Sequence, residues 1–318
     1  MRLWRHMRAL WPRWTLLPPL PFVAYGIIML ARGELRWDHV AMMILVPVLA
    51  YATPWTKKLC LGSYPMGLTG LFYDAMRYFK NVGVSPERVH DCDLRAIELR
   101  LFGINVAGPS GVERITLNDW FLTHHWTWLD IYCGIPYGGF IFMSLGAAVV
   151  LYFKDYSAVQ RYAWVFFLMN VAAFITYHIY PAAPPWYYHA HGCEISMTAL
   201  PSEGPRLAHV DAVLGITYFK GIYSRSSDLY GAVPSLHVAY PLLIVVEGWR
   251  SFGRFGRALS LLFLFSMGFA AVYLDHHWVC DVLLGFLYCV SAVALVRFIW
   301  ARLAARAAPV ALDLRPQA

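Results

Sequence analysis

His277 and Asp281 are the two residues whose types and spacing point most directly to chemistry. Four residues apart on a helix, they share one face, so the carboxylate can hold one ring nitrogen of the histidine. The other ring nitrogen is then free to act as a nucleophile. An aspartate in an apolar stretch is costly unless it has a partner or a task. Taken alone, the pair is equally compatible with a structural hydrogen bond.

A second reactive set is the sequence Gly-Ala-Val-Pro-Ser-Leu-His at residues 231–237. Pro234 suits the first turn of a helix, where free N–H groups and the helix dipole create an anion site. Ser235 adds a hydroxyl donor, and His237 lies in the same turn. A lone histidine at the start of a membrane helix is more often interfacial, so this motif depends on its neighbours for a functional interpretation. Together with the histidine–aspartate pair, it predicts a catalytic centre.

The run Tyr-Pro-Ala-Ala-Pro-Pro-Trp-Tyr-Tyr at residues 180–188 closes an apolar helix. Its prolines stop the helix, and its aromatic residues suit a membrane interface. Such a helix exit is usually structural. Within it, Trp186 and Tyr187 are candidates for substrate contacts.

The remaining histidines and the cysteines do not predict a metal site. There is no His-Glu-x-x-His motif and no Cys-x-x-Cys pair, so we expect neither a metal nor another cofactor. His276 would point about 100° away from its neighbour on a helix, which favours packing. The six cysteines are predicted to be mostly small apolar fillers. Four other histidines are predicted to be interfacial or solvated: His124, His125, His189 and His191.

Composition places these residues in a membrane protein. Hydrophobic residues make up 59% of the 318 and charged residues 14%, against roughly 25% charged in a soluble domain. The net charge of +7 lies largely at helix ends, without a basic stripe on a soluble domain. It therefore indicates attraction to anionic lipid, and a nucleic-acid partner is excluded.

The predicted fold is an all-α, polytopic transmembrane bundle. Two shorter runs, 14–31 and 38–53, are predicted to be further spans, and the first is expected to be a retained helix because no signal cleavage site follows it. Segment 61–79 is either a further crossing or an interfacial helix, because Asp74 and Arg77 interrupt it. Five runs have about the ~20 residues that a crossing needs: 131–153, 161–180, 232–249, 257–275 and 278–300.

The distribution of lysine and arginine predicts an orientation, because these residues favour cytoplasmic loops. The connection 181–231 and the turn at 275–277 then lie together on the non-cytoplasmic side. A basic N-terminus and Lys57-Lys58 also favour the cytoplasm. Seven spans cannot place both of these on the cytoplasmic side, so we expect six to eight spans. The residues that set the cytoplasmic side are Lys154, Arg161, Arg250, Arg254, Arg257, Arg302, Arg306 and Arg315.

Four regions are expected along the chain. They are N-terminal transmembrane helices in 1–60, an amphipathic or interfacial segment in 61–127, a catalytic transmembrane core in 128–303 and a cytoplasmic tail in 304–318. The stretch 80–127 is the most polar and is expected on a membrane surface.

The ordered set of the three motifs, ending in His-His-Trp-x-x-Asp at 276–281, resembles the type 2 phosphatidic acid phosphatase superfamily. Within it, the resemblance is to the branch of fungal inositol phosphorylceramide synthase and, more distantly, of sphingomyelin synthases. It covers about 119–290, over half the chain. It implies a six-helix core with the active site on the luminal or periplasmic face. It also implies that His277 attacks phosphorus, that Asp281 orients it, and that His237 exchanges protons with the leaving and accepting alcohols.

This sequence departs from the phosphatases of that superfamily at three cationic positions. Their Lys-x6-Arg-Pro becomes Ala173 and Tyr180 before Pro181, and their Ser-Arg becomes Ala270 and Ala271. Charge on the phosphoryl oxygens still needs stabilisation. Ser235 and the backbone around it are expected to hold these oxygens, and the cationic candidates are Arg206, His209, Lys220 and Arg225.

The leading hypothesis is a phosphotransferase that moves phosphoinositol, or another phospho-alcohol, from a glycerophospholipid to a lipid hydroxyl such as that of a ceramide. A diester donor needs less cationic cover than a monoester dianion, which fits the missing cations. The alternatives are a lipid phosphatase, in which water is the acceptor, and a catalytically silent lipid-binding protein. A transporter is disfavoured because no inverted repeat is visible. The expected location is a bacterial inner membrane with a periplasmic active site, and the oligomeric state stays open.

Overall fold

The computed structural model describes residues 1–80, 82–109, 111–226 and 228–307. Almost all regular structure in these ranges is helical, and the two strands form one hairpin. The predicted all-α bundle is confirmed. Most of the predicted tail, including Arg315, lies outside the described residues.

Five helices form the central bundle, and they pack on one another in several pairs. Fully buried small residues such as Ala173, Ala270 and Ala271 line their contacts and let the helices approach closely. Two of these positions are those where the phosphatases carry cations. The helices are α7 (Thr127–Lys154), α8 (Tyr156–Ile179), α12 (Leu236–Gly248), α13 (Arg254–Tyr273) and α14 (Val279–Ala307).

Within the described ranges, α7, α8, α13 and α14 are long and apolar enough to cross a membrane. The fifth predicted span, 232–249, is a helix only from Leu236, and its 13 residues cover roughly 20 Å. It begins later than predicted because Ser235 is extended, with ψ of 107°. The total of six to eight spans stays a prediction.

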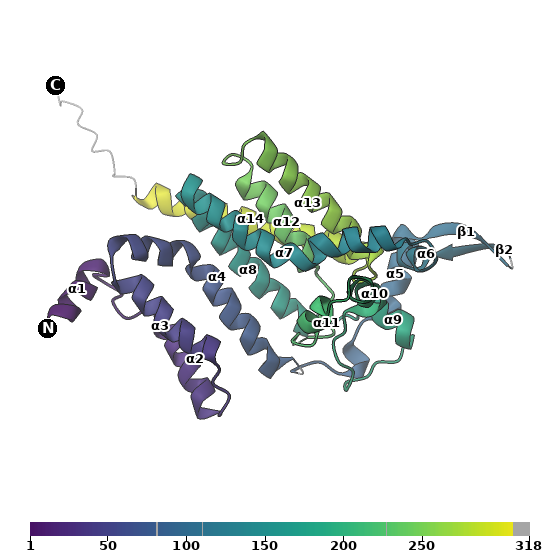
Figure 1. Cartoon of the computed structure of the whole chain (residues 1–318), viewed down its shortest axis with the longest axis horizontal. Coiled ribbons are helices and arrows are strands. Elements are labelled where there is room, and N and C mark those ends of the chain that lie inside the picture. The colour runs from purple at the N-terminus through teal and green to yellow at the C-terminus, as the bar shows by residue number, and fades with distance from the viewer. Residues whose placement is uncertain (81, 110, 227, 308–318) are drawn as a thin grey trace, which may run out of the picture.

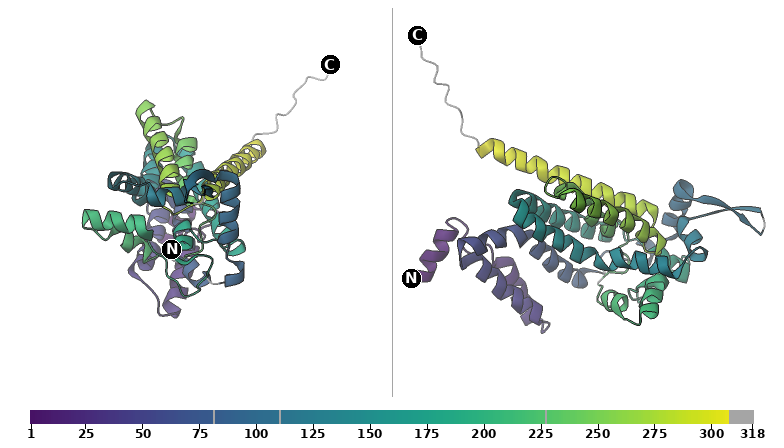
Figure 2. Two further views of the ribbon diagram at one scale, coloured as in Figure 1. Left: turned by 90° about the vertical axis from the view of Figure 1, so that its right-hand side faces the viewer. Right: turned by 45° about the horizontal axis from the view of Figure 1, so that its top comes forward.

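Four helices precede this bundle, and the first three stand to one side of it (Figure 1; Figure 2). The predicted segment 61–79 belongs to a single 26-residue helix that packs along α8, and the expected boundary after residue 60 falls inside that helix. The four are α1 (Arg2–Leu10), α2 (Leu20–Ala31), α3 (Trp37–Tyr51) and α4 (Pro54–Phe79).

Short elements gather at the end of the bundle opposite the N-terminus, and we call this group the cap (Figure 1). Its hairpin was not predicted; Ile104 pairs with Ile115 and Gly108 with Gly111. The cap consists of η1 (Pro86–Arg88), α5 (Cys92–Phe102), β1 (Ile104–Gly108), β2 (Gly111–Ile115), α6 (Leu117–Thr123), α9 (Pro185–His191), α10 (Gly204–Leu214) and α11 (Tyr218–Tyr223).

A disulfide between Cys92 and Cys193 joins the start of α5 to the segment after α9. The prediction that the cysteines are apolar fillers is therefore wrong for this pair, whose 101-residue separation carries no sequence signal. It fits Cys60, Cys133 and Cys289, which are buried and free.

His189 connects the cap to the turn that follows α13. Its Nδ1 lies 2.7 Å from Asp275 Oδ2, and its Nε2 lies 2.9 Å from Asp119 Oδ1. Its side chain is 15% exposed, so of the two predicted alternatives, interfacial or solvated, the solvated one is wrong. Burial opposes its protonation, but the hydrogen bonds to Asp119 and Asp275 outweigh burial and raise the pKa of His189 to about 9.

The carboxyl pKa values of its two partners move in opposite directions. Burial would raise the pKa of Asp119, but the hydrogen bonds from His189 and Thr116 and the charge of Arg95 together outweigh burial, and the pKa is lowered. Burial dominates at Asp275, the more enclosed partner, and raises its pKa. Asp119 is therefore the partner whose ionised form is favoured beside the imidazolium.

We predict that this bridge makes stability depend on pH. Because the pKa of His189 is raised on folding, its contribution is complete below the unfolded value of about 6.5 and is lost as pH rises through about 9. His189→Gln keeps hydrogen-bonding capacity without titrating. It should lower the thermal unfolding midpoint in detergent more at about pH 6 than at about pH 10. An equal loss at both pH values would contradict the charged bridge.

Candidate active site

The three predicted catalytic residues meet where the bundle adjoins the cap. His277 Nε2 lies 3.2 Å from His237 Nδ1, and His277 Nδ1 lies 3.4 Å from Asp281 Oδ2. Asp281 is fully buried, and His277 is 5% exposed. One ring nitrogen of His277 thus faces the carboxylate and the other faces a second imidazole.

His277 lies in a turn, residues 274–278, rather than on a helix as the spacing argument assumed. Asp275 has a left-handed φ of 66°, and the His277 N–H donates to Ala271 O at the end of α13. Asp281, in the first turn of α14, accepts the Trp278 N–H at 2.9 Å. The carboxylate therefore reaches back over the start of its own helix toward the imidazole.

Burial also sets the protonation state of this turn. Desolvation lowers the pKa of His277 to about 4 and that of His276 to about 3. Both imidazoles are thus neutral near pH 7, and a neutral imidazole has a lone pair to offer as a nucleophile.

Close backbone contact between α12 and α14 places His237 against His277. The Ser235 N–H donates to Asp281 O at 3.1 Å. A Cβ atom at Gly285 would lie 2.2 Å from Ser235 O, so only glycine permits this approach. Ser235 Oγ is buried and has no hydrogen-bond partner among the described residues.

The proline-rich run at 180–188 holds the segment before α12. The Ala182 N–H donates to Tyr230 O at 2.7 Å, and the Ala232 N–H donates to Ala182 O at 3.2 Å. Two of the sequence motifs are therefore joined through their backbones.

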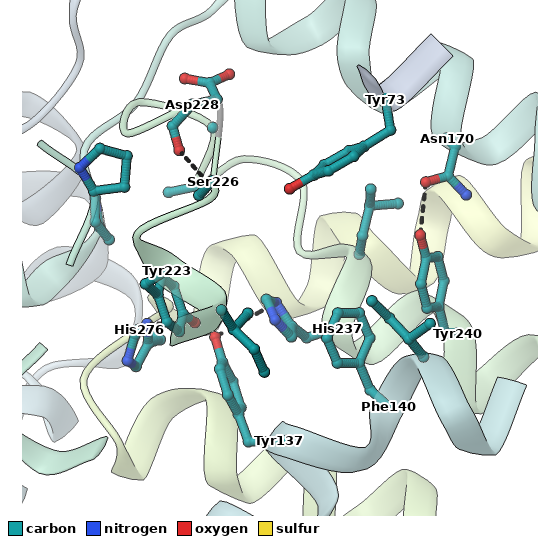
Figure 3. Close-up of a pocket in the computed structure, with 18 of the residues that line it drawn as sticks. Tyr73, Tyr137, Phe140, Asn170, Tyr223, Ser226, Asp228, His237, Tyr240 and His276 are labelled. Carbon is teal, nitrogen blue, oxygen red and sulfur yellow. Dashed lines mark hydrogen bonds between the residues drawn. The ribbon is translucent and has the colours of Figure 1, made fainter. Parts of the chain in front are cut away.

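A cavity of about 600 Å³ opens from the two histidines toward α4, α7 and α8. Its lining is mostly apolar, and its wall includes Phe142, which is 68% exposed on the outer face of α7. Figure 3 shows His237 projecting into the cavity beside Phe140 and Tyr137, with Tyr73 across from them. The Tyr137 ring stacks on His237 at a centroid distance of 4.3 Å.

The predicted cationic candidates do not line this cavity. Arg206 NH1 lies 3.2 Å from Asp130 Oδ1, and His209 Nδ1 lies 2.9 Å from Asp130 Oδ2. Lys220 and Arg225 are exposed. Among the described residues, the lining contains neither lysine nor arginine.

The two aromatic residues predicted to contact the substrate lie in different places. Trp186 lines the cavity. Tyr187 is fully buried outside it, where its hydroxyl accepts the Ser196 N–H at 2.9 Å and donates to Glu194 O.

Sequence reasoning missed some lining residues. His276, expected to pack away from its neighbour, lies in the lining because the turn replaces the helix. Its Nδ1 is 3.3 Å from the Tyr223 hydroxyl, and its Nε2 donates to Glu203 O at 2.8 Å. Tyr137 and Tyr223 belong to separate helices, and no spacing rule links them to the motifs.

The comparisons with known proteins agree with this geometry. The phosphoinositol dihydroceramide synthase of Bacteroides thetaiotaomicron is 35% identical over 253 residues, which cover 79% of this chain and 81% of that protein. The inositol phosphorylceramide synthase of Candida albicans is 30% identical over 159 residues, or 49% of this chain and 34% of that protein. The catalytic subunit of the Saccharomyces cerevisiae enzyme is 28% identical over 237 residues, or 74% of this chain and 56% of that protein.

The chain thus spans most of the bacterial relative and only part of the two fungal ones. No solved structure matches it. The family model described as PAP2 superfamily matches residues 111–295, more than half of the chain and all three candidate catalytic residues. The chain belongs to the PAP2 superfamily.

Proposed function

We propose that this membrane phosphotransferase moves phosphoinositol from phosphatidylinositol to the hydroxyl of a ceramide and releases diacylglycerol. The observation that carries the proposal is His277, held between Asp281 and His237 at the inner end of an apolar cavity. The names of the similar proteins support the choice of head group and acceptor.

The geometry suits a two-step transfer through a phosphohistidine. His277 Nε2 attacks phosphorus, the N–P bond forms, and the P–O bond to diacylglycerol breaks as His237 protonates the leaving oxygen. His237 then removes the proton from the ceramide hydroxyl. That oxygen attacks phosphorus and the N–P bond breaks. Asp281 holds Nδ1 and stabilises the positive charge on the ring during each step.

The phosphoryl oxygens need hydrogen-bond donors, because no lysine or arginine is among the described lining residues. Ser235 directly precedes α12 and has a buried Oγ without a hydrogen-bond partner among the described residues, but neither Pro234 nor Ser235 is in the cavity lining. The N-terminus of α12 carries His237, which is in the lining, and could offer N–H groups to an anion. The hydroxyls of Tyr137 and Tyr223 also border the cavity. A diester carries one negative charge fewer than a monoester dianion. Neutral hydrogen-bond donors can therefore stabilise the proposed substrate more readily than they could a monoester.

The cavity itself favours lipid acceptors over water. Its apolar lining extends from the histidines to side chains on the outer face of α7, among them Ile141, Phe142 and Leu145. An acyl chain can therefore lie between α4 and α7 while its polar end reaches His277. Apolar walls of this kind exclude the competing acceptor, water.

We predict that the purified protein makes a new phosphoinositol-bearing lipid from labelled phosphatidylinositol only when ceramide is present. His277→Ala should lower this rate at least about a thousandfold, because the nucleophile is lost. His124→Ala is the matched control, since this exposed histidine lies outside the cavity lining. The readout is separation of the lipid products.

Other outcomes of that assay would contradict the proposal. Acceptor-independent release of inositol phosphate or free phosphate would indicate a phosphatase. No product from several donors would indicate a catalytically silent lipid-binding protein.

We also propose that the active site lies on the non-cytoplasmic face, in a bacterial inner membrane on the periplasmic side. The connections α7–α8 and α12–α13 lie at the end of the bundle away from the cap (Figure 1). The basic residues in or beside these connections are Lys154, Arg161, Arg250, Arg254 and Arg257. The Cys92–Cys193 disulfide lies in the cap, and disulfides persist in oxidising compartments.

This orientation predicts which introduced thiols a membrane-impermeant maleimide reaches in intact cells. Lys220→Cys in α11 should be labelled, whereas Arg254→Cys at the start of α13 should react only after the membrane is opened. The unmodified chain gives the background from its free cysteines. The reverse labelling pattern would overturn the assignment.

A further inference from the structure

Glu98 is a fully buried carboxylate in the cap that the proposed chemistry does not use. It lies on α5, before the residues 111–295 that the family model matches. It is also outside the lining of the cavity. A buried carboxylate is costly unless it is well paired, so its hydrogen-bond partners indicate its role in the structure.

Those partners are the first two backbone N–H groups of α14. The Val279 N–H donates to Glu98 Oε1 at 2.9 Å, and the Cys280 N–H donates to Glu98 Oε2 at 3.1 Å. Both are among the N–H groups that a helix cannot satisfy itself. A carboxylate at this end also interacts favourably with the helix dipole. Each carboxylate oxygen has one donor, so the contact fixes the helix start in two places.

The helix start held in this way carries the reactive pair. His277 lies two residues before Val279, and Asp281 directly follows Cys280. A second side chain of the cap, Asn118, donates from Nδ2 to His277 O at 3.2 Å. The backbone from the His277 carbonyl to the Cys280 N–H is therefore held by the cap.

The placement of α5 is itself well determined. Leu94, one turn before Glu98, packs in a buried cluster with Trp278, Ala182 and Val233. The disulfide at Cys92 ties the start of α5 to the segment after α9. Glu98 is thus presented to α14 by a helix that is anchored on two sides.

We propose that Glu98 is a positioning residue of the phosphotransfer centre, which holds the start of α14 so that His277 and Asp281 keep their relative geometry. This inference rests on the proposed function. A reacting group that moves by about 1 Å can lose on the order of a hundredfold in rate. Because Glu98 touches no substrate, its loss should change the rate of transfer and not the binding of either lipid.

The test uses Glu98→Gln, which keeps the shape of the side chain but turns one of its oxygens into an N–H donor facing a backbone N–H group. Glu113→Gln is the matched control, because the same change falls on an exposed strand of the hairpin. Turnover is measured per folded, monodisperse protein, together with KM for phosphatidylinositol and for ceramide. Amide hydrogen exchange of the peptide containing 277–281 is measured without substrate.

We expect Glu98→Gln to lower kcat by about 10- to 100-fold, with each KM changed less than about twofold. Exchange at Val279 and Cys280 should become faster, and Glu113→Gln should match the parent in every measurement. Glu98→Asp keeps the charge but loses reach, so its effect should be smaller. If Glu98→Gln does not fold, Glu98→Asp takes its place in the same measurements.

Unchanged kcat per folded protein, or unchanged exchange at the start of α14, would overturn the assignment. So would a rise in KM that accounts for the whole loss of activity, because Glu98 would then act on substrate binding. The exchange measurement needs no turnover. It therefore separates a failure of this inference from a failure of the proposed reaction, which the parent protein tests on its own.

Discussion

The structure depends on one constraint, which is that the turn at 274–278 is buried together with its polar groups. A buried N–H or C=O group must find a partner. The N–H groups of this turn donate to α13 and to Asp281, whereas two of its carbonyls and the Asp275 side chain find their partners in the cap. Trp186 N–H donates to Asp275 O, His189 pairs with the Asp275 carboxylate, and Asn118 reaches His277 O. The cap is therefore part of the structure that holds the active-site turn in place. It supplies hydrogen-bond partners to the turn that carries the reactive imidazole.

The same burial explains how the chemistry can operate with few charges. Desolvation keeps His277 neutral, and the close approach of α12 to α14 at Gly285 sets His237 opposite it. Arg206 was predicted to bind the phosphate. It forms an ion pair with Asp130 and lies over the Tyr273 ring, outside the cavity lining. The site thus relies on hydroxyls, backbone N–H groups and imidazoles in a setting of low polarity, where each interaction is stronger than in water.

The helical class and the five central helices could be predicted because apolar runs of bilayer length leave few alternatives. The grouping of His237, His277 and Asp281 followed from their motifs, although the assumed helix through 277 is a turn. Other features had no local signal. The Cys92–Cys193 bond, the His189 bridge and the Glu98 contact join segments 70 to 182 residues apart, and such pairings arise from tertiary packing. Position in the chain suggests Arg206 and His209 as phosphate-binding residues. Their actual partner, Asp130, lies more than 70 residues earlier, so only the fold shows the pairing.

The central claim is that His277 Nε2 becomes covalently bonded to the phosphorus of the donor. The most direct measurement is to mix the protein with phosphatidylinositol labelled at phosphorus, without an acceptor, to quench within a turnover and to map the labelled peptide. The account predicts an acid-labile, base-stable adduct on the peptide that contains His277, which disappears when ceramide is added before the quench. Label on the peptide of His237, or product formation by a protein that never carries label, would contradict it.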